Sequence, residues 1–514
     1  MLPAAGPAAA HGFGQRYDLP IPLWLFVTGA GLTVAVSFLM MALFVRAVPA
    51  SHHTPRLDLM RTWPGRALAA PAVLTGWRLI GVALYLLVIC AGLFGQQSPL
   101  RNIAPAMVWA IWWVGMAYIS ALIGNLWAIV NPLDTLFAWA EALYARLRSG
   151  PTLVIGLRYP DSFGVWPSVA LFLAFVWMEL VWENSDTPAS LAAAILAYSA
   201  FTWFAMLLFG RTEWLRRGEV FSVAFAILAR FAPTETRVVD REACAQCRAP
   251  QCGRAAADCI DCADCWNRAR AQDRAWNLRP FAVGLLVRQP VEFSRVVLVV
   301  LMLASVSFDG FLETPAWAAI MESMVAPTRD AAGRGEDSSA WVQTLGLVAA
   351  PVFFLAVYLA FCRLIVWCGE SPAQARSQSG QAGATLRIAG LFVFTLVPIA
   401  IAYHLAHYLS FLVMAGQYLI PLASDPFGAG WDLFGSKMYF IRIGIIDARA
   451  VWYVSLVAIV TGHIAAVYLA HVLALREFPE RKAALRSQYP MLILMISYTM
   501  VSLWIMAQPI VAVR

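Results

Sequence analysis

Residues 391–413 read LFVFTLVPIAIAYHLAHYLSFLV, an apolar run that contains two histidines, His404 and His407. About 20 apolar residues in a helix cross the hydrocarbon core of a bilayer, so this run predicts a transmembrane helix. Ionisable side chains are costly at that depth and usually have a function. The i,i+3 spacing places both imidazoles on one face of the helix. The pair predicts either a transition-metal site or two histidines hydrogen-bonded between packed helices.

The composition extends this interpretation to the whole chain. Of its residues, 61% are hydrophobic and 13% are charged. Soluble globular proteins are about half apolar and about a quarter charged. The predicted fold class is therefore all-α, a polytopic transmembrane helical bundle. We expect about ten spans, at residues 21–45, 77–96, 104–124, 164–182, 188–210, 291–308, 341–367, 386–413, 451–474 and 490–511.

The loops between these spans alternate in charge. Arginines concentrate in every second loop, and the remaining loops are short or acidic. The positive-inside rule places the arginine-rich loops in the cytoplasm, which leaves both termini outside. This pattern predicts a multi-pass membrane protein with both termini on the outer side, and it accounts for the net charge of +7 without nucleic acid. The first residues lack the basic start and apolar core of a cleaved signal peptide.

The predicted organisation has four parts. They are an outer-side N-terminal arm (1–20), spans one to five (21–210), a cytoplasmic loop (211–289), and spans six to ten with two outer-side loops (290–514, with loops 309–340 and 414–450).

Two cytoplasmic stretches have the amphipathic pattern of helices that lie along a membrane surface. One is the interfacial helix 132–148, where Asn131 can cap the helix and Pro132 can take its first position. The other covers 212–231 in the loop 211–289, with Arg216, Arg217 and Glu219 on its polar side.

The cytoplasmic loop is rich in cysteine, with six of the nine cysteines spaced as C-x2-C-x4-C-x6-C-x2-C-x2-C. Structural disulfides are uncommon in the cytoplasm, whereas C-x2-C pairs are typical of zinc and iron–sulfur sites. We therefore predict a metal site in this loop, with structural zinc favoured and an iron–sulfur cluster as the alternative. Its ligands would come from Cys244, Cys247, Cys252, Cys259, Cys262 and Cys265.

A second group of polar residues falls at one depth in the predicted topology. His404 and His407 lie in the outer half of the eighth span, Asp309 at the outer end of the sixth, and His463 near the middle of the ninth. Imidazoles and a carboxylate suit zinc, copper, manganese or iron. We predict that these four residues hold a divalent transition metal, with Asp309 and His463 as the catalytic pair. Four further residues are candidates for positions around this site: His11, Glu179, Asp425 and Asp432.

Several stretches together resemble the fenitrothion-hydrolase-like family of bacterial integral membrane proteins. They are HGFGQRYDLP at 11–20, Phe308–Asp309–Gly310, the region 406–435, and LRSQYP at 485–490. The likeness extends over nearly the whole chain, although the six-cysteine loop is not part of the family pattern. The resemblance implies a hydrolase that cleaves organophosphorus triesters and releases a nitrophenol. Together with the loop charges it implies a bacterial inner membrane, with both termini in the periplasm.

Three functions follow as hypotheses. The first is a membrane-embedded, metal-dependent phosphotriesterase in which metal-bound hydroxide attacks phosphorus and an apolar small-molecule substrate enters from the membrane lipid. The second is a transporter or metal-handling protein, because embedded histidines and acids also form ion paths. The third is a redox subunit with an iron–sulfur cluster, acting with a second subunit. The sequence argues against transport, because it shows no internal repeat and no pair of broken helices.

Overall fold

The computed structural model describes residues 17–45, 54–148, 153–240, 242, 244, 247, 259–287, 290–332, 338–369, 380–442, 444–478 and 480–510. Within these residues, ten helical segments are long and apolar enough to cross a membrane, which confirms the predicted count. The spans are α1 (Leu23–Phe44), α3 (Pro71–Phe94), α4–η4–α5 (Ile103–Pro105, Ala106–Gly115, Met116–Leu122), α8 (Trp166–Leu180), α9 (Pro188–Phe209), α14 (Phe293–Leu312), α16 (Ser338–Gly369), α17–η8–α18 (Gly380–Phe392, Val393–Leu396, Val397–Ala415), α20 (Ala448–Glu477) and α21 (Arg481–Ile510).

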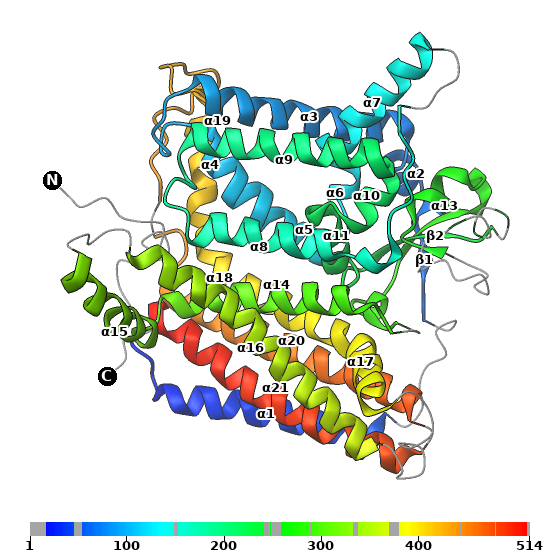
Figure 1. Cartoon of the computed structure of the whole chain (residues 1–514), viewed down its shortest axis with the longest axis vertical. Helices are drawn as coiled ribbons and strands as arrows, with labels where there is room; N and C mark the ends of the chain where they lie inside the picture. Colours follow the sequence, from blue (N-terminus) through cyan, green and yellow to red (C-terminus); the bar gives the residue numbers. More distant parts are fainter. Residues whose placement is uncertain are drawn as a thin grey trace.

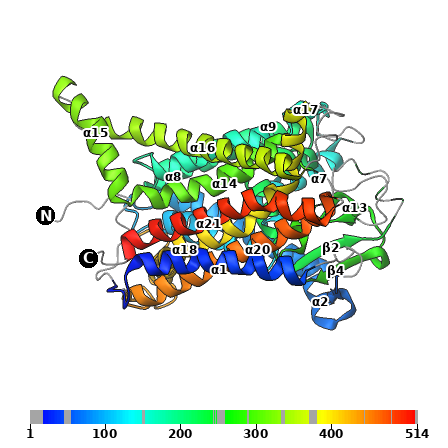
Figure 2. The ribbon, with the colours of Figure 1, turned by 90° about the horizontal axis from the view of Figure 1, so that it is seen from below.

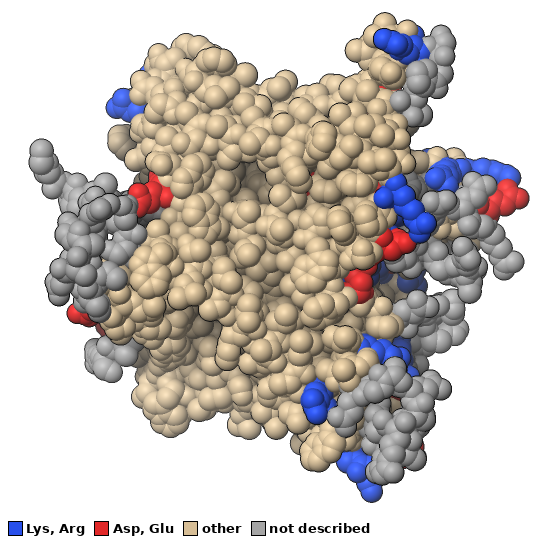
Figure 3. Space-filling view, viewed as in Figure 1, with Lys and Arg blue, Asp and Glu red and all other residues tan. Residues whose placement is uncertain are grey.

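The long helices run side by side between two ends of the molecule (Figures 1 and 2). One end, here called the sheet side, carries a small β-sheet; the other, the α15 side, carries α15 (Pro315–Ala332) and α19 (Leu419–Ser424). The backbone N–H of Tyr17 donates to the carbonyl of Ile510 at 2.9 Å, so the described chain begins and ends at the α15 side. Most Lys and Arg residues visible in Figure 3 lie at the sheet side, and the visible surface between the two ends carries almost no charged residues.

The outer helices expose apolar side chains that a globular protein would bury. Only 17% of the most apolar window of α16 is buried, and Val352 and Phe353 on this helix are 62% and 65% exposed. Apolar side chains on the surface of a spanning bundle contact lipid tails, where they cost nothing. The fold is thus that of a polytopic membrane protein.

The β-sheet at the sheet side was not predicted from the sequence. It contains β1 (Leu57–Asp58), β4 (Arg274–Leu278), β2 (Thr234–Val238) and β3 (Cys259–Ile260) in that spatial order, and all its described pairings are antiparallel. Thr236 lies opposite Trp276 in the central pair. The strands come from residues far apart in the sequence and are as short as two residues, so no alternating pattern is long enough to reveal them.

A buried ion cluster anchors this sheet to the bundle. Glu235 on β2 accepts hydrogen bonds from Arg56 and Arg279, each at 2.5 Å, and neither the Glu235 nor the Arg279 side chain is more than 1% exposed. The neighbouring Arg230 lies 4.8 Å from the ring centroid of Phe394, which belongs to the 3-10 turn η8 in the eighth span. The sheet is therefore coupled directly to a membrane helix.

The prediction of one amphipathic surface helix at 212–231 is wrong. This stretch forms two helices instead. They are α10 (Arg211–Arg217) and α11 (Val220–Ala229), separated at Gly218 and Glu219. Eight of the ten residues of α11 are buried, because this helix inserts between spans and does not lie on the surface. The other predicted helix is present, since α7 covers Pro132–Leu147 and Asn131 accepts from the backbone N–H groups of its first turn. Its position along the membrane surface stays a prediction.

The fully buried carboxylate of Glu219 makes the insertion of α11 possible. It accepts from the backbone N–H groups of Phe221 and Ser222 at 3.1 and 2.7 Å, and from the hydroxyl of Tyr198. A helix N-terminus leaves unpaired donors that are costly to bury, and a side-chain oxygen at the N-cap satisfies them.

Replacing Glu219 by glutamine is expected to lower the free energy of unfolding by about 1–3 kcal/mol. The amide offers one acceptor where the carboxylate offers two, so a buried donor is left unpaired. Thermal unfolding of the detergent-purified protein, followed by tryptophan fluorescence, measures the effect. Glu322→Gln, at an exposed position of α15, is the matched control. Equal unfolding temperatures for the two variants would contradict this role of Glu219.

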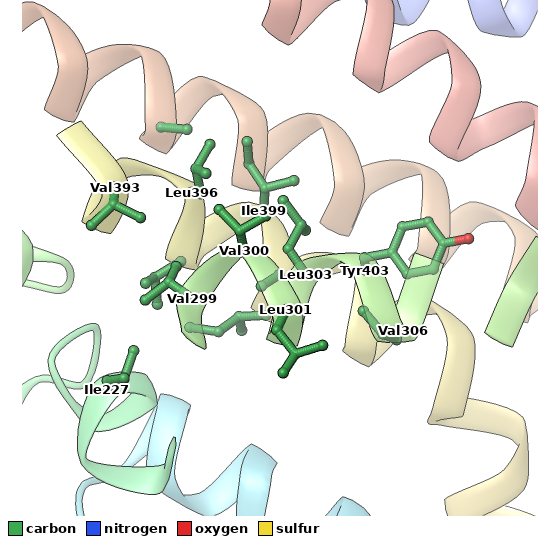
Figure 4. Close-up of a cluster of buried hydrophobic side chains, with 14 of the residues drawn as sticks. Ile227, Val299, Val300, Leu301, Leu303, Val306, Val393, Leu396, Ile399 and Tyr403 are labelled. Atoms are coloured by element: carbon green, nitrogen blue, oxygen red, sulfur yellow. The ribbon is translucent and has the colours of Figure 1, made fainter. Parts of the chain in front are cut away.

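Two of the spans are interrupted, contrary to the sequence-based expectation. The third contains a ten-residue π-helical segment, η4, and the eighth contains the 3-10 turn η8 followed by Pro398. Figure 4 shows apolar packing at the second interruption, where Val299 and Val300 of α14 lie close to Val393 and Leu396 of η8 and to Ile399 of α18. Such interruptions inside a bundle often mark functional sites.

Candidate functional site in the membrane and the cysteine cluster

A hydrogen-bonded polar network joins three spans near the α15 side. The hydroxyl of Tyr408 donates to Oδ2 of Asp309 at 2.5 Å and lies 3.5 Å from Oε1 of Glu179. Nε2 of His407 lies 2.9 Å from the same Asp309 oxygen. Two carboxyl groups, on α8 and α14, are thus linked through one phenol of α18.

The π-helical segment η4 of the third span also contributes to this network. Its Trp113 donates through Nε1 to Oε1 of Glu179 at 3.0 Å. His404 of α18 is hydrogen-bonded to the backbone of Val114, in the same segment. Just beyond, the hydroxyl of Tyr118 donates to the backbone carbonyl of Leu405 at 3.0 Å. The interrupted third and eighth spans therefore meet at the polar network.

A cavity of about 50 Å³ opens beside the network. Glu179, Asp309, His404 and Tyr408 provide its polar wall, and the rest of the lining is almost entirely apolar. Nε2 of His404 is buried without a hydrogen-bond partner among the described residues. A buried polar atom normally finds a partner, and each water needs a volume of roughly 10–15 Å³. The cavity has room for about three or four waters by that measure, whereas sites for drug-sized ligands measure roughly 300–1,000 Å³.

The four-residue metal centre predicted in the membrane is not assembled. Among the described residues, groups of three ligand atoms within 4.8 Å of one another occur only among cysteines. His404 faces Trp113 and Tyr118, and His407 faces Asp309. Side chains three residues apart differ by about 60° around a helix, enough to point the two rings at different neighbours.

His463 does not join the predicted pair with Asp309. Its Nδ1 donates to the backbone carbonyl of Ile459 at 2.8 Å, and its ring lies 5.7 Å from that of Tyr498. Its Nε2 is buried and has no hydrogen-bond partner in the described part of the chain.

The four additional candidates fall into three groups. Glu179 belongs to the network, as described above. Asp425 and Asp432 serve as turn caps: Asp425 accepts from the N–H groups of Ala429 and Gly430, both at 2.8 Å, and Asp432 accepts from that of Lys437 at 3.1 Å. His11 lies outside the described residues.

Glu313, just beyond the end of α14, connects the network to the α15 side. Partial burial raises the pKa of its carboxyl to about 7; the imidazole of His407 opposes this shift and the charge of Asp309 adds to it. Sequence reasoning treated Glu313 only as an acid in an outer loop, and Tyr408 and Trp113 were missed entirely. For Tyr408, the only signal was its position next to His407.

The raised pKa of Glu313 predicts a pH-dependent stability. Between pH about 4.5 and about 7 the folded chain keeps a proton that the unfolded chain loses, so the stability of the wild type falls as the pH rises through this window. Glu313→Gln removes that dependence and is expected to unfold at a higher temperature than the wild type at pH 8, but not at pH 5. Parallel profiles for the variant and the wild type would contradict the assignment.

The cysteine cluster lies beside the sheet, at the opposite end of the molecule. Cys259 begins β3, Cys262 precedes the short helix α13 (Ala263–Arg268), and Cys265 lies within it. Two groups of cysteines could hold a metal ion: Cys244, Cys259 and Cys265, and Cys247, Cys262 and Cys265. The predicted metal site in this region is therefore confirmed as a possibility. Of its six predicted ligands, Cys259 is disulfide-bonded and Cys252 lies outside the described residues.

The fold and these two sites define a class: a polytopic membrane protein with a cysteine cluster that could hold a metal. No family model, no curated protein and no solved structure matches the chain. The resemblance to the fenitrothion-hydrolase-like family therefore remains a prediction.

Proposed function

We propose that this chain is a proton-conducting membrane transport protein whose path passes through Glu179, Tyr408 and Asp309. One observation carries the proposal: two carboxyl groups inside the bundle are linked by a single phenol. Two like charges in so apolar a setting are costly, so the low-energy state of the pair holds a proton. A hydroxyl between two carboxyl groups can pass that proton by exchanging its donor and acceptor roles.

The surroundings of the pair support a hydrated path. The cavity beside Glu179 has space for a few waters, and the unpartnered Nε2 of His404 needs one. Glu313 has a pKa of about 7 near the α15 side, which suits proton exchange with neutral solvent. Apolar residues, including Leu122 and Leu228, line the rest of the cavity and would form the closed end of the path.

The charge distribution supports one orientation. Lys and Arg gather at the sheet side, and the positive-inside rule then places that side in the cytoplasm and Glu313 in the periplasm of a bacterial inner membrane.

Reconstitution into liposomes tests the proposal. A potassium gradient with valinomycin imposes an inside-negative potential, and a trapped pH-sensitive dye reports proton entry. We expect acidification in liposomes that contain the protein and none in protein-free liposomes. An equal, slow leak in both preparations would contradict proton conduction.

A phosphotriester hydrolase is the second candidate. The observation that favours it is the Asp309–His407 pair, because a carboxylate that orients an imidazole makes it a general base for water. A metal-bound hydroxide finds less support, since the described histidines do not gather around one point. Release of 4-nitrophenol from a chromogenic phosphotriester by the purified protein, lost in His407→Ala, would favour this function over the first.

A further inference from the structure

The spacing of the sulfur atoms in the cysteine cluster distinguishes a single metal ion from an iron–sulfur cluster. Sγ of Cys247 lies 3.6 Å from Sγ of Cys262, and Cys265 is within 4.8 Å of both. A tetrahedral ion with metal–sulfur bonds of about 2.3 Å holds its sulfur ligands about 3.8 Å apart. In a [4Fe–4S] cluster each cysteine binds a different iron atom, and in a [2Fe–2S] cluster each iron takes two cysteines, so neither cluster brings three cysteine sulfurs this close together. The observed spacing matches one ion.

The pattern of the chain selects four ligands from the cysteines. Cys244 and Cys247 form one C-x2-C pair, and Cys262 and Cys265 form the other, with residues 248–261 between them. Two such pairs at about this separation are typical of four-cysteine zinc sites. All four carry reduced thiols, whereas Cys259 is disulfide-bonded and has no thiolate to offer.

We propose that Cys244, Cys247, Cys262 and Cys265 bind one zinc ion tetrahedrally. The sulfurs of Cys247, Cys262 and Cys265 lie within 4.8 Å of one another. The sulfur of Cys244 lies within 4.8 Å of the Cys265 sulfur. Tetrahedral binding requires the Cys244 sulfur to move closer to the sulfurs of Cys247 and Cys262. The backbone favours this step, because the N–H of Cys247 donates to the carbonyl of Cys244 at 3.1 Å and so closes the first pair into a turn.

The site has a structural consequence for the sheet side. Cys262 and Cys265 flank the start of α13, and β3 pairs with β2, which carries the buried Glu235. A closed four-thiolate site cross-links such short elements, which cannot bury enough apolar surface to hold each other in place.

Metal analysis of the full-length protein, purified in detergent without added reductant so that the Cys259 disulfide is kept, tests the proposal. We expect about one zinc per chain, and loss of most of it in each of C244S, C247S, C262S and C265S. C259S is expected to keep the zinc, as is C90S, whose cysteine lies in the span α3. The cobalt-substituted protein should show the visible bands of tetrahedral thiolate coordination.

The alternatives give different results. Several iron atoms per chain with broad visible absorbance would overturn the single-ion site in favour of a cluster, and loss of zinc in C259S would overturn the ligand set. No bound metal would overturn both. If a serine variant fails to fold, titration of the wild type with an organomercurial decides, because release of one zinc should need four thiols.

Discussion

Asp309→Asn is expected to reduce voltage-driven proton entry by roughly tenfold or more, the factor produced by each 1.4 kcal/mol added to a barrier. Asparagine preserves the size of the side chain and can still accept from the hydroxyl of Tyr408, but it cannot take up a proton. Because Asp309 contacts both Tyr408 and His407, its loss interrupts the network between these two side chains.

The same experiment has internal controls. Glu179→Gln and Tyr408→Phe alter the other two members of the path and are expected to have comparable effects. Glu183→Gln changes an exposed carboxylate four residues from Glu179 and should leave proton entry unchanged. Flux in Asp309→Asn within about twofold of the wild type, for a variant that elutes as a single species, would rule out the path.

Glu235→Ala is expected to destabilise the sheet side by about 3–5 kcal/mol. The substitution leaves the guanidinium of Arg279 buried with only backbone carbonyls as partners, and an uncompensated buried charge costs that much. Arg56 is more exposed and can turn to solvent. Urea unfolding followed by fluorescence in mild detergent measures the change.

Two further variants separate the buried charge from a general effect of removing an acid. Asp161→Ala removes an exposed pair with Arg158 and a 3.7 Å pair with Arg217, which keeps Glu213 as a partner, and should cost less than about 1 kcal/mol. The double variant Glu235→Leu/Arg279→Met removes both charges and is expected to recover much of the loss. A double variant as unstable as Glu235→Ala alone would show that the charge is not the cause.

The ten spans were predictable because crossing a bilayer is a local property of the chain. A run of apolar residues long enough to cross the bilayer can be recognised from hydropathy alone, whichever helices it packs against. The cap of α7 by Asn131 is local in the same way, since it involves residues three positions apart or fewer. The C-x2-C spacing indicates a cysteine site for the same reason, because the two thiols of each pair lie within one turn of the chain.

The membrane network could not be predicted, because it depends on how helices turn toward one another. Glu179, Asp309 and Tyr408 come from three spans, and their meeting depends on the rotation of each helix and on the π-helical turn that brings Trp113 to Glu179. The rotation of a helix and the presence of a π-helical turn cannot be recognised from the hydropathy of the sequence. For the same reason His404 and His407, neighbours on one predicted helix face, have different hydrogen-bond partners, the backbone of Val114 and the carboxyl of Asp309, although both rings contact Tyr408. Glu219 caps a buried helix. Apolar character determined which segments enter the membrane, and only packing between them decided which polar groups meet inside the bundle.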